Sequence, residues 1–255
     1  MEAKDDGKRH VATARPSALV EAPTAEPLVS VNPNATVHRI QLDDTSWVDL
    51  WRQWLLGAET LYESLRTTVN WRTTKLFRYE QTVEERRLGS SWRRGTALPH
   101  PALAEITRWQ QRRYRVEFEG FSMIHYRDGN DGQGFHRDTD MRWLDDTIIG
   151  VLTLGATRPW LLRPRGNRFS DGLAQGATHD LLPASGDLLV MGGRCQADWE
   201  HSVPYLPSRG NSSTSAVEPR ISLQWRATRK SGEPFLGPSF RAAVRYGHGK
   251  AAPRD

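Results

Sequence analysis

The sequence predicts an α+β protein with a mainly β core, in which an antiparallel sandwich or jelly roll has helices packed outside it. The main observation is a series of short strand-like runs in the second half of the chain, separated by Gly-rich and polar turns. The runs are RVEFEGFSMIHY, TIIGVLTL, WLLRP, HDLLP, GDLLVMG and RISLQWRA. Two apolar patterns with helical spacing in the first half supply the expected outer helices.

The first half of the chain is expected to form one strand and two helices. The strand is the run VHRIQL, which begins at Val37. Polar side chains at residues 43–46 can cap backbone N–H groups ahead of an apolar ladder, so a helix is expected over residues 47–55. A second helix is expected over residues 101–113, where apolar residues recur at helical spacing and a proline occupies the first turn.

A length of 255 residues fits one domain with two tails. Residues 1–35 mix proline, alanine, threonine and charged residues without periodicity, which predicts a disordered leader. Residues 36–230 are the expected domain, and residues 231–255 are expected to be a loosely ordered C-terminal tail. Within the domain, the stretch SRGNSSTSAVEP is expected to be a flexible loop.

Composition limits the possible classes of protein and of metal site. The formal net charge of +5 would attract a polyanion, but many basic proteins share it. Cys195 is the single cysteine, so a metal would have to be bound by histidines and carboxylates. The sequence shows no signal-peptide pattern and no apolar run long enough to cross a bilayer. We therefore expect a cytoplasmic monomer without a membrane partner.

The first cluster that could carry chemistry is the segment GFHRDTD, which contains His136 and Asp138. Residues i and i+2 of a strand share a face, so this imidazole and carboxylate could bind one ion. An exposed polar strand end would explain the pair equally simply. The preceding Gly-rich turn and His201, 63 residues beyond Asp138 (201 − 138), favour a metal site. Two histidines and one carboxylate leave open positions on Fe(II) for a cosubstrate and O2.

The second cluster is the segment PRISLQWR, in which polar and apolar residues alternate. Its polar residues are Arg220, Ser222, Gln224 and Arg226. In an ordinary sheet this face would meet water. In a sandwich whose interior holds a metal, a guanidinium could instead bind a dicarboxylate through two parallel hydrogen bonds.

Together these segments resemble the successive core motifs of the AlkB family of Fe(II)/2-oxoglutarate-dependent dioxygenases. The resemblance covers about residues 115–230, in order. It runs from YRDG through HRD, then LTLGATRPWLLRPR, GDLLVMGGRCQADWEHSVP and PRISLQWR. The resemblance implies a double-stranded β-helix core with flanking helices and a nucleotide-recognition hairpin lid. It also implies that His136, Asp138 and His201 bind Fe(II), that Arg220 and Tyr126 bind 2-oxoglutarate, and that Arg226 lies nearby.

Two positions depart from the pattern of that family. Ile124 stands where an asparagine is common, two residues before Tyr126, and Ser222 stands where another asparagine is common. Ser222 still belongs to the expected cosubstrate-binding residues. Both changes remove potential hydrogen bonds, so the resemblance implies weaker 2-oxoglutarate binding than is usual in the family.

The resemblance further implies oxidative dealkylation of N-alkylated bases in DNA, with release of formaldehyde, succinate and CO2. Asp140 follows Asp138 by two residues, and the corresponding acidic position in AlkB proteins lies close to the damaged base. A carboxylate there could accept a hydrogen bond from the exocyclic amine of a cationic methylated base. A solvent-facing turn residue is the alternative interpretation of Asp140.

Residues 82–92, TVEERRLGSSW, occupy the place of the hairpin lid in AlkB proteins. We expect Tyr79 or Trp92 to stack against an extruded base, and Arg86 and Arg87 to contact phosphates. A second basic cluster consists of Arg112, Arg113 and Arg115. Core packing is the alternative interpretation of the two aromatic residues, and solvated surface charge is the alternative interpretation of the basic residues.

Other functions keep part of this pattern. An RNA demethylase or a protein hydroxylase or demethylase of the same family would retain the metal motif, and the basic hairpin does not separate DNA from RNA. A binding module without iron is disfavoured by the intact set of proposed ligands. A zinc hydrolase would leave Arg220 and Arg226 without a role.

Overall fold

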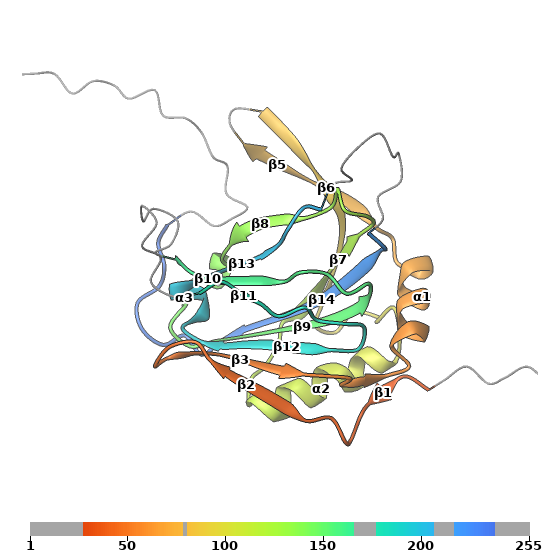
Figure 1. Cartoon of the computed structure of the whole chain (residues 1–255), viewed down its shortest axis with the longest axis horizontal. Helices are drawn as coiled ribbons and strands as arrows, with labels where there is room; N and C mark the ends of the chain where they lie inside the picture. The colour runs from red at the N-terminus through yellow and green to blue at the C-terminus, as the bar shows by residue number, and fades with distance from the viewer. Residues whose placement is uncertain (1–27, 79–80, 166–176, 207–216, 238–255) are drawn as a thin grey trace, which may run out of the picture.

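The computed structural model of the protein describes residues 28–78, 81–165, 177–206 and 217–237. These residues form two large antiparallel sheets that face each other, with α1 (Ala58–Thr68) and α2 (Ala102–Tyr114) outside the larger sheet (Figure 1). This arrangement confirms the expected mainly β fold with flanking helices and is consistent with a jelly roll.

The larger sheet has eight strands, in the order β2 (Val37–Gln41), β3 (Ser46–Trp51), β12 (Leu188–Gly193), β9 (Thr147–Gly155), β14 (Arg220–Thr228), β7 (Gly120–Tyr126), β6 (Gln81–Arg93) and β5 (Arg72–Arg78). The smaller sheet has the order β11 (His179–Asp180), β10 (Leu161–Pro164), β13 (Trp199–Val203) and β8 (Gln133–His136). Two short strands, β1 (Ser30–Val31) and β4 (Leu55–Leu56), pair separately. The short helix α3 spans Cys195–Asp198, and the 3-10 helix η1 spans Thr139–Met141.

The large sheet is buried on both faces, because its central strands contribute alternate residues to two hydrophobic cores. In β9, Leu152 and Leu154 pack in the core shared with α1 and α2. Ile149 and Val151 pack in the core between the two sheets. A strand with two buried faces reads as a nearly continuous apolar run, as TIIGVLTL does.

The alternation predicted for PRISLQWR is confirmed in β14. Ile221, Leu223 and Trp225 belong to the helix-side core. Successive residues of a strand point to opposite faces, so the polar residues of β14 project toward the smaller sheet. This polar face is therefore an interior face of the sandwich, where Arg220 and Ser222 are buried.

The helix expected over residues 47–55 is wrong, because this segment begins with β3. Trp51 packs in the helix-side core, whereas Val48 and Leu50 pack between the sheets. A strand with two buried faces carries apolar residues at most positions, so helical spacing occurs in it by default. Pairing with β2 and β12 then decides the conformation.

The other two elements expected in the first half of the chain are present in the structure. The strand at Val37 and the helix after Pro101 are confirmed as β2 and α2. Helix α1 was not anticipated, and its N-cap is Gly57, which makes no side-chain capping hydrogen bond. The usual polar signal for a helix start is therefore missing from the sequence.

The described part of the chain extends into both expected tails. β1 lies within the range 1–35, so order begins before residue 36. The Phe235 N–H donates to the Arg142 carbonyl at 2.7 Å, so residues 231–237 contact the domain. Residues 1–27 and 238–255, and most of the expected loop at 208–219, lie outside the described residues.

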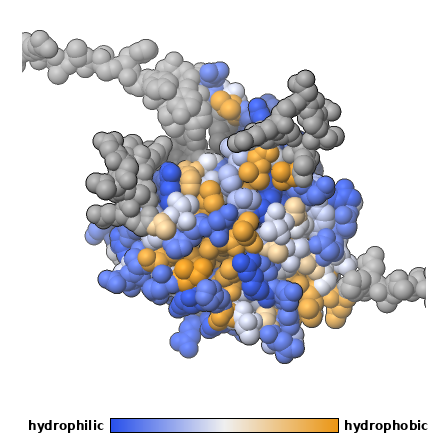
Figure 2. All heavy atoms as spheres, in the orientation of Figure 1, coloured by the Kyte–Doolittle hydropathy of each residue, from blue (hydrophilic) through white to orange (hydrophobic). Residues whose placement is uncertain are grey.

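No helix among the described residues is both long and apolar enough to cross a membrane. On the face shown in Figure 2, hydrophilic side chains surround a smaller hydrophobic area.

Candidate metal centre and cosubstrate site

The two histidines of the predicted metal site come from neighbouring strands of the smaller sheet. His136 ends β8, His201 is central in β13, and the antiparallel register places the two residues opposite each other. Their ring centroids are 4.2 Å apart. His136 Nδ1 lies 2.9 Å from the Gly134 carbonyl oxygen, and the Trp160 ring stacks on His201 at 5.2 Å. These contacts orient both imidazoles.

Asp138 does not share a strand with His136, contrary to the expected i, i+2 arrangement. β8 ends at His136, and Asp138 is the residue that precedes η1. The Asp138 N–H donates to the Gln196 side-chain oxygen at 2.8 Å, and Arg226 Nε donates to the Asp138 carboxylate at 2.9 Å. A turn held by Gln196 and Arg226 therefore places this carboxylate beside the histidines.

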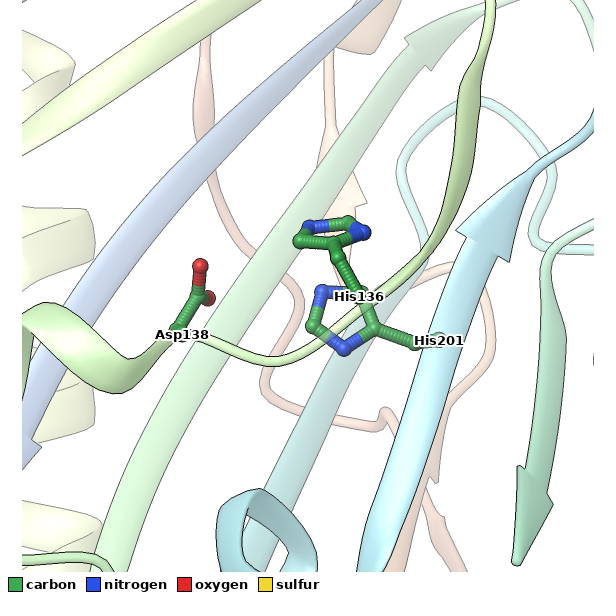
Figure 3. Close-up of side chains that lie close together, drawn as sticks. All are labelled: His136, Asp138 and His201. Carbon is green, nitrogen blue, oxygen red and sulfur yellow. The ribbon is translucent and has the colours of Figure 1, made fainter. Parts of the chain in front are cut away.

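The three side chains can each offer one ligand atom, and these atoms all lie within 4.8 Å of one another (Figure 3). Burial lowers the pKa of His201 to about 3 and also lowers the pKa of His136. Burial alone would raise the pKa of Asp138, but the charges of Arg226 and the histidines hold it below its usual range. His201 Nδ1 is buried without a hydrogen-bond partner among the described residues. Neutral imidazoles and an ionised carboxylate are the forms that bind metal, so the group fits Fe(II).

Arg220 provides the cation of the predicted cosubstrate site. It is fully buried, and its N–H groups donate only to neutral acceptors, the hydroxyls of Ser222 and Thr153 and the Arg158 carbonyl, at 3.2–3.3 Å. Tyr126, also buried, lies opposite Arg220 in the β7–β14 pair. Burial lowers the pKa of the Arg220 guanidinium to about 10, which Tyr126 opposes and Arg158 reinforces. A buried guanidinium paired with no acid in the described chain fits a carboxylate ligand.

Arg158 is a second buried arginine, which the sequence did not single out. Its guanidinium donates to the carbonyls of Asp128 at 3.0 Å and Asp131 at 2.8 Å, and it lies 5.4 Å from the Tyr126 ring centroid. Its own carbonyl accepts from Arg220. Arg158 therefore braces the loop after β7 against the Arg220 site. It is one of three arginines in LTLGATRPWLLRPR, and nothing in that segment distinguishes it from the other two.

Comparison with known proteins agrees with this geometry. Residues 58–226 match the family model of the 2OG-Fe(II) oxygenase superfamily. The chain belongs to this superfamily. Its members use Fe(II) and 2-oxoglutarate, and the His136, Asp138, His201 and Arg220 side chains described above fit both.

Curated relatives of this 2OG-Fe(II) oxygenase are AlkB proteins. Alpha-ketoglutarate-dependent dioxygenase alkB homolog 3 of Bos taurus is 27% identical over 68% of this chain and 62% of the relative. The Homo sapiens protein of the same name is 26% identical over 66% of this chain and 61% of the relative. DNA oxidative demethylase ALKBH2 of Homo sapiens is 26% identical over 51% of this chain and 49% of the relative. These likenesses confirm the AlkB resemblance, although the chain spans 49–62% of the length of these relatives.

A cleft of about 300 Å³ opens beside the metal ligands of this oxygenase. Asp138 and Arg226 line it, and so does Asp140, which is exposed. Asp140 is not in a strand with Asp138, because η1 begins at Thr139. Asp140 nevertheless lines the same cleft as Asp138, which is the proximity that the sequence led us to expect.

Residues 82–92, which were expected to lie in the lid, form most of β6, one strand of a β5–β6 hairpin. β5 and β6 pair antiparallel at one edge of the large sheet and project from the domain (Figure 1). Arg86 is exposed, as a phosphate-binding residue should be. Arg87 is instead buried, and its guanidinium donates to Gln133 and, at 2.6 Å, to Glu85. Arg87 also lines the cleft, and its expected contact with phosphate stays a prediction.

Of the two aromatic residues expected to contact a base, Trp92 lies among the described residues. Trp92 stacks on Phe121 with ring centroids 5.3 Å apart and packs against the helix-side core. These contacts agree with core packing, the alternative considered for this residue, and its expected stacking on a base stays a prediction. Tyr79 lies outside the described residues.

The two departures from the AlkB pattern lie directly opposite each other. Ser222 pairs with Ile124 in the register between β14 and β7, two residue pairs from Arg220 and Tyr126 on the same face. Ile124 also lines the cleft. Both substitutions therefore change one small area between the Arg220 site and the cleft.

Proposed function

We propose that this protein oxidatively removes alkyl groups from N-alkylated bases in DNA. The observation that carries the proposal is the convergence of the His136, Asp138 and His201 side chains beside a polar cleft that Asp138 lines, with a buried Arg220 that pairs with no acid among the described residues. The printed name of one relative, DNA oxidative demethylase, supports the choice of substrate class.

The chain's own residues bind and orient the reactants. His136, Asp138 and His201 would hold Fe(II), and Arg220 would bind a carboxylate of 2-oxoglutarate through charge-assisted hydrogen bonds. When bound, Fe(II) and 2-oxoglutarate with O2 supply the hydroxylation of an alkyl carbon, with succinate and CO2 as coproducts. A hydroxylated N-methyl group then loses formaldehyde and leaves the unmodified base.

Asp140 is the proposed determinant of lesion preference. Its carboxylate lines the cleft and is exposed to an incoming base. A cationic methylated adenine or cytosine could donate its exocyclic amine to this carboxylate, whereas a methylated thymine would face it with a carbonyl oxygen. We therefore propose a preference for cationic lesions.

The test is to incubate the protein with Fe(II), 2-oxoglutarate, ascorbate and methylated oligonucleotides, and to measure formaldehyde and repaired base. Formaldehyde from methylated DNA is the expected result, and its absence with every DNA oligonucleotide would overturn the proposal. RNA oligonucleotides of the same sequence test the RNA demethylase alternative, and succinate formed without any oligonucleotide reports the iron site separately.

The role of Asp140 is tested in the same assay with Asp140→Asn, which keeps the shape and removes the charge. The variant should lose more activity on cationic lesions than on methylated thymine, with an unchanged iron content. Equal loss on both lesion classes would assign Asp140 a structural role, and loss of iron would place it in the metal site.

A further inference from the structure

A hollow lined by basic residues lies away from the metal cleft, at the C-terminal end of α2. It has a volume of about 360 Å³ and is lined by Arg108, Gln111, Arg112, Arg115, Val116 and Glu117. The three arginines are exposed. Within the described chain, their guanidinium groups make no hydrogen bond or ion pair, whereas the neighbouring Arg94 donates to Glu117.

Helix geometry explains why these arginines converge. Residues four apart lie on one face of a helix, so Arg108 and Arg112 follow one another along α2. Arg115 is the left-handed C-cap residue of α2 and lines the same hollow just beyond the helix end. Arg113 belongs to a different face, where its guanidinium lies 5.5 Å from the Trp51 ring centroid. The basic cluster seen in the sequence therefore divides into one arginine that packs on aromatic rings and others that line the hollow.

The acid in the hollow is already paired. Glu117 accepts a hydrogen bond from Arg94 at 3.1 Å, and Arg94 also lies 3.5 Å from Glu119. The pairing partly neutralises Glu117. The hollow thus keeps an excess of positive charge, which is the chemistry that attracts phosphate.

The hollow lies at the same end of the large sheet as the mouth of the metal cleft. Glu119 lines the cleft and Glu117 lines the hollow, two residues apart. Arg229, just after β14, donates to the Tyr114 carbonyl near the end of α2 at 2.9 Å. A polyanion that leaves the cleft could therefore reach the arginines after crossing a short strip of surface.

We propose that this hollow binds backbone phosphates of nucleic acid, next to the nucleotide whose base enters the metal cleft. The inference rests on the proposed function, because it takes the substrate to be a nucleic acid. Arg108 and Arg112 are separated by about 6 Å along the helix axis, at roughly 1.5 Å per residue, and Arg115 follows them at the C-cap. The two helical arginines alone therefore span about two nucleotides, at a rise of roughly 3.4 Å per nucleotide along one strand. The site therefore accepts a short tract of backbone and reads no base.

The test compares oligonucleotide binding by a triple variant, Arg108→Ala with Arg112→Ala and Arg115→Ala, with binding by the wild type. Fluorescence anisotropy with an unmodified single-stranded DNA 15-mer would give the dissociation constant over a series of salt concentrations. Loss of three phosphate contacts should reduce the slope of log K against log salt by about 2, because each contact contributes roughly 0.7 in single strands.

Two control variants separate this site from general charge. Lysines at the same three positions keep the charge and should restore most of the slope. The triple variant Asn34→Asp, Thr36→Glu and His38→Glu changes the formal charge from +5 to +2 (5 − 3), as the arginine variant does, but alters an exposed edge far along the sheet from the hairpin. It should bind DNA with nearly the wild-type slope.

Turnover distinguishes failure of this inference from failure of the proposed function. On a methylated 15-mer the arginine variant should show a KM raised on the order of tenfold at low salt with an unchanged kcat. On a methylated trinucleotide, which contacts the hollow little, it should match the wild type. If the arginine variant keeps the salt slope and the KM of the wild type, the phosphate site is overturned and the proposed demethylation is not affected. If the wild-type protein itself releases no formaldehyde, the proposed function is overturned.

Discussion

The metal centre and the β5–β6 hairpin hold their side chains in different ways. The histidines lie on strands of the smaller sheet whose inward faces are packed, and Arg220 lies on β14, which is paired on both sides and almost wholly buried. The hairpin ends the large sheet, and most of β6 before Arg87 is exposed. Packing therefore fixes the orientation of the side chains at the metal centre. In the hairpin, a side chain is either packed or exposed to solvent, depending on which face of the strand it occupies. The following predictions test that difference.

The largest effect is expected at the metal centre. His136→Ala, Asp138→Ala and His201→Ala should each abolish turnover, because each removes one of three protein ligands. Iron content, 2-oxoglutarate consumption and circular dichroism would be measured together. His179→Ala, a matched substitution on β11 outside the ligand group, should retain activity. Full activity in any of the three ligand variants would show that the interior site is misassigned.

Arg220→Ala should raise the KM for 2-oxoglutarate by about 10- to 100-fold, because charge-assisted hydrogen bonds to a carboxylate are lost. The fold should persist, since the partners of Arg220 among the described residues are neutral acceptors and its removal leaves no buried acid unpaired there. Arg66→Ala, which removes an exposed arginine of α1 paired with Glu63, is the control and should leave the KM unchanged. An unchanged KM in Arg220→Ala would contradict the cosubstrate assignment.

Two neighbouring arginines should differ within the hairpin. Arg86→Ala removes an exposed cation and should lower the salt slope of DNA binding by about 0.7–0.9, with little change in stability. Arg87→Ala leaves Glu85 and Gln133 without their donor and should lower the free energy of unfolding by about 1–3 kcal/mol. Thermal unfolding and anisotropy measured on both variants check the contrast. The reverse pattern would mean that Arg87 faces the nucleic acid.

The smallest effect is expected where the interior site meets the cleft. Ile124→Asn introduces an amide opposite Ser222, two residue pairs from Arg220 on the same face, and should tighten 2-oxoglutarate binding by less than about tenfold. Calorimetric titration of the metal-loaded protein with 2-oxoglutarate would measure the change in affinity. Ile124→Val, which keeps the apolar character, should leave the affinity unchanged. Weaker binding in Ile124→Asn alone would indicate that the amide cannot reach the cosubstrate.

Much of the interior site could be predicted from the sequence because local patterns encode it. The alternation in PRISLQWR assigns Arg220 and Ser222 to one face, and strand geometry makes that assignment reliable. The sequence singled out His136, Asp138 and His201 by residue type and order, and the structure brings these candidate ligands together. Their placement was not fully predicted, because the turn at Asp138 depends on Gln196 and Arg226, which lie far along the chain.

Only the tertiary structure decided the conformation of β3 and the burial of Arg87, because both depend on the elements that pack against them. The residues of β3 fit a helix by spacing, and only their burial between two cores makes them a strand. Arg87 and Arg86 are adjacent in sequence, yet packing against β8 buries one and leaves the other in water. The sequence by itself determined which chemical groups this protein has and their alternation along each strand, because that period is local. Which groups are buried, paired or left free was decided by long-range contacts, because burial is a property of the assembled sheets.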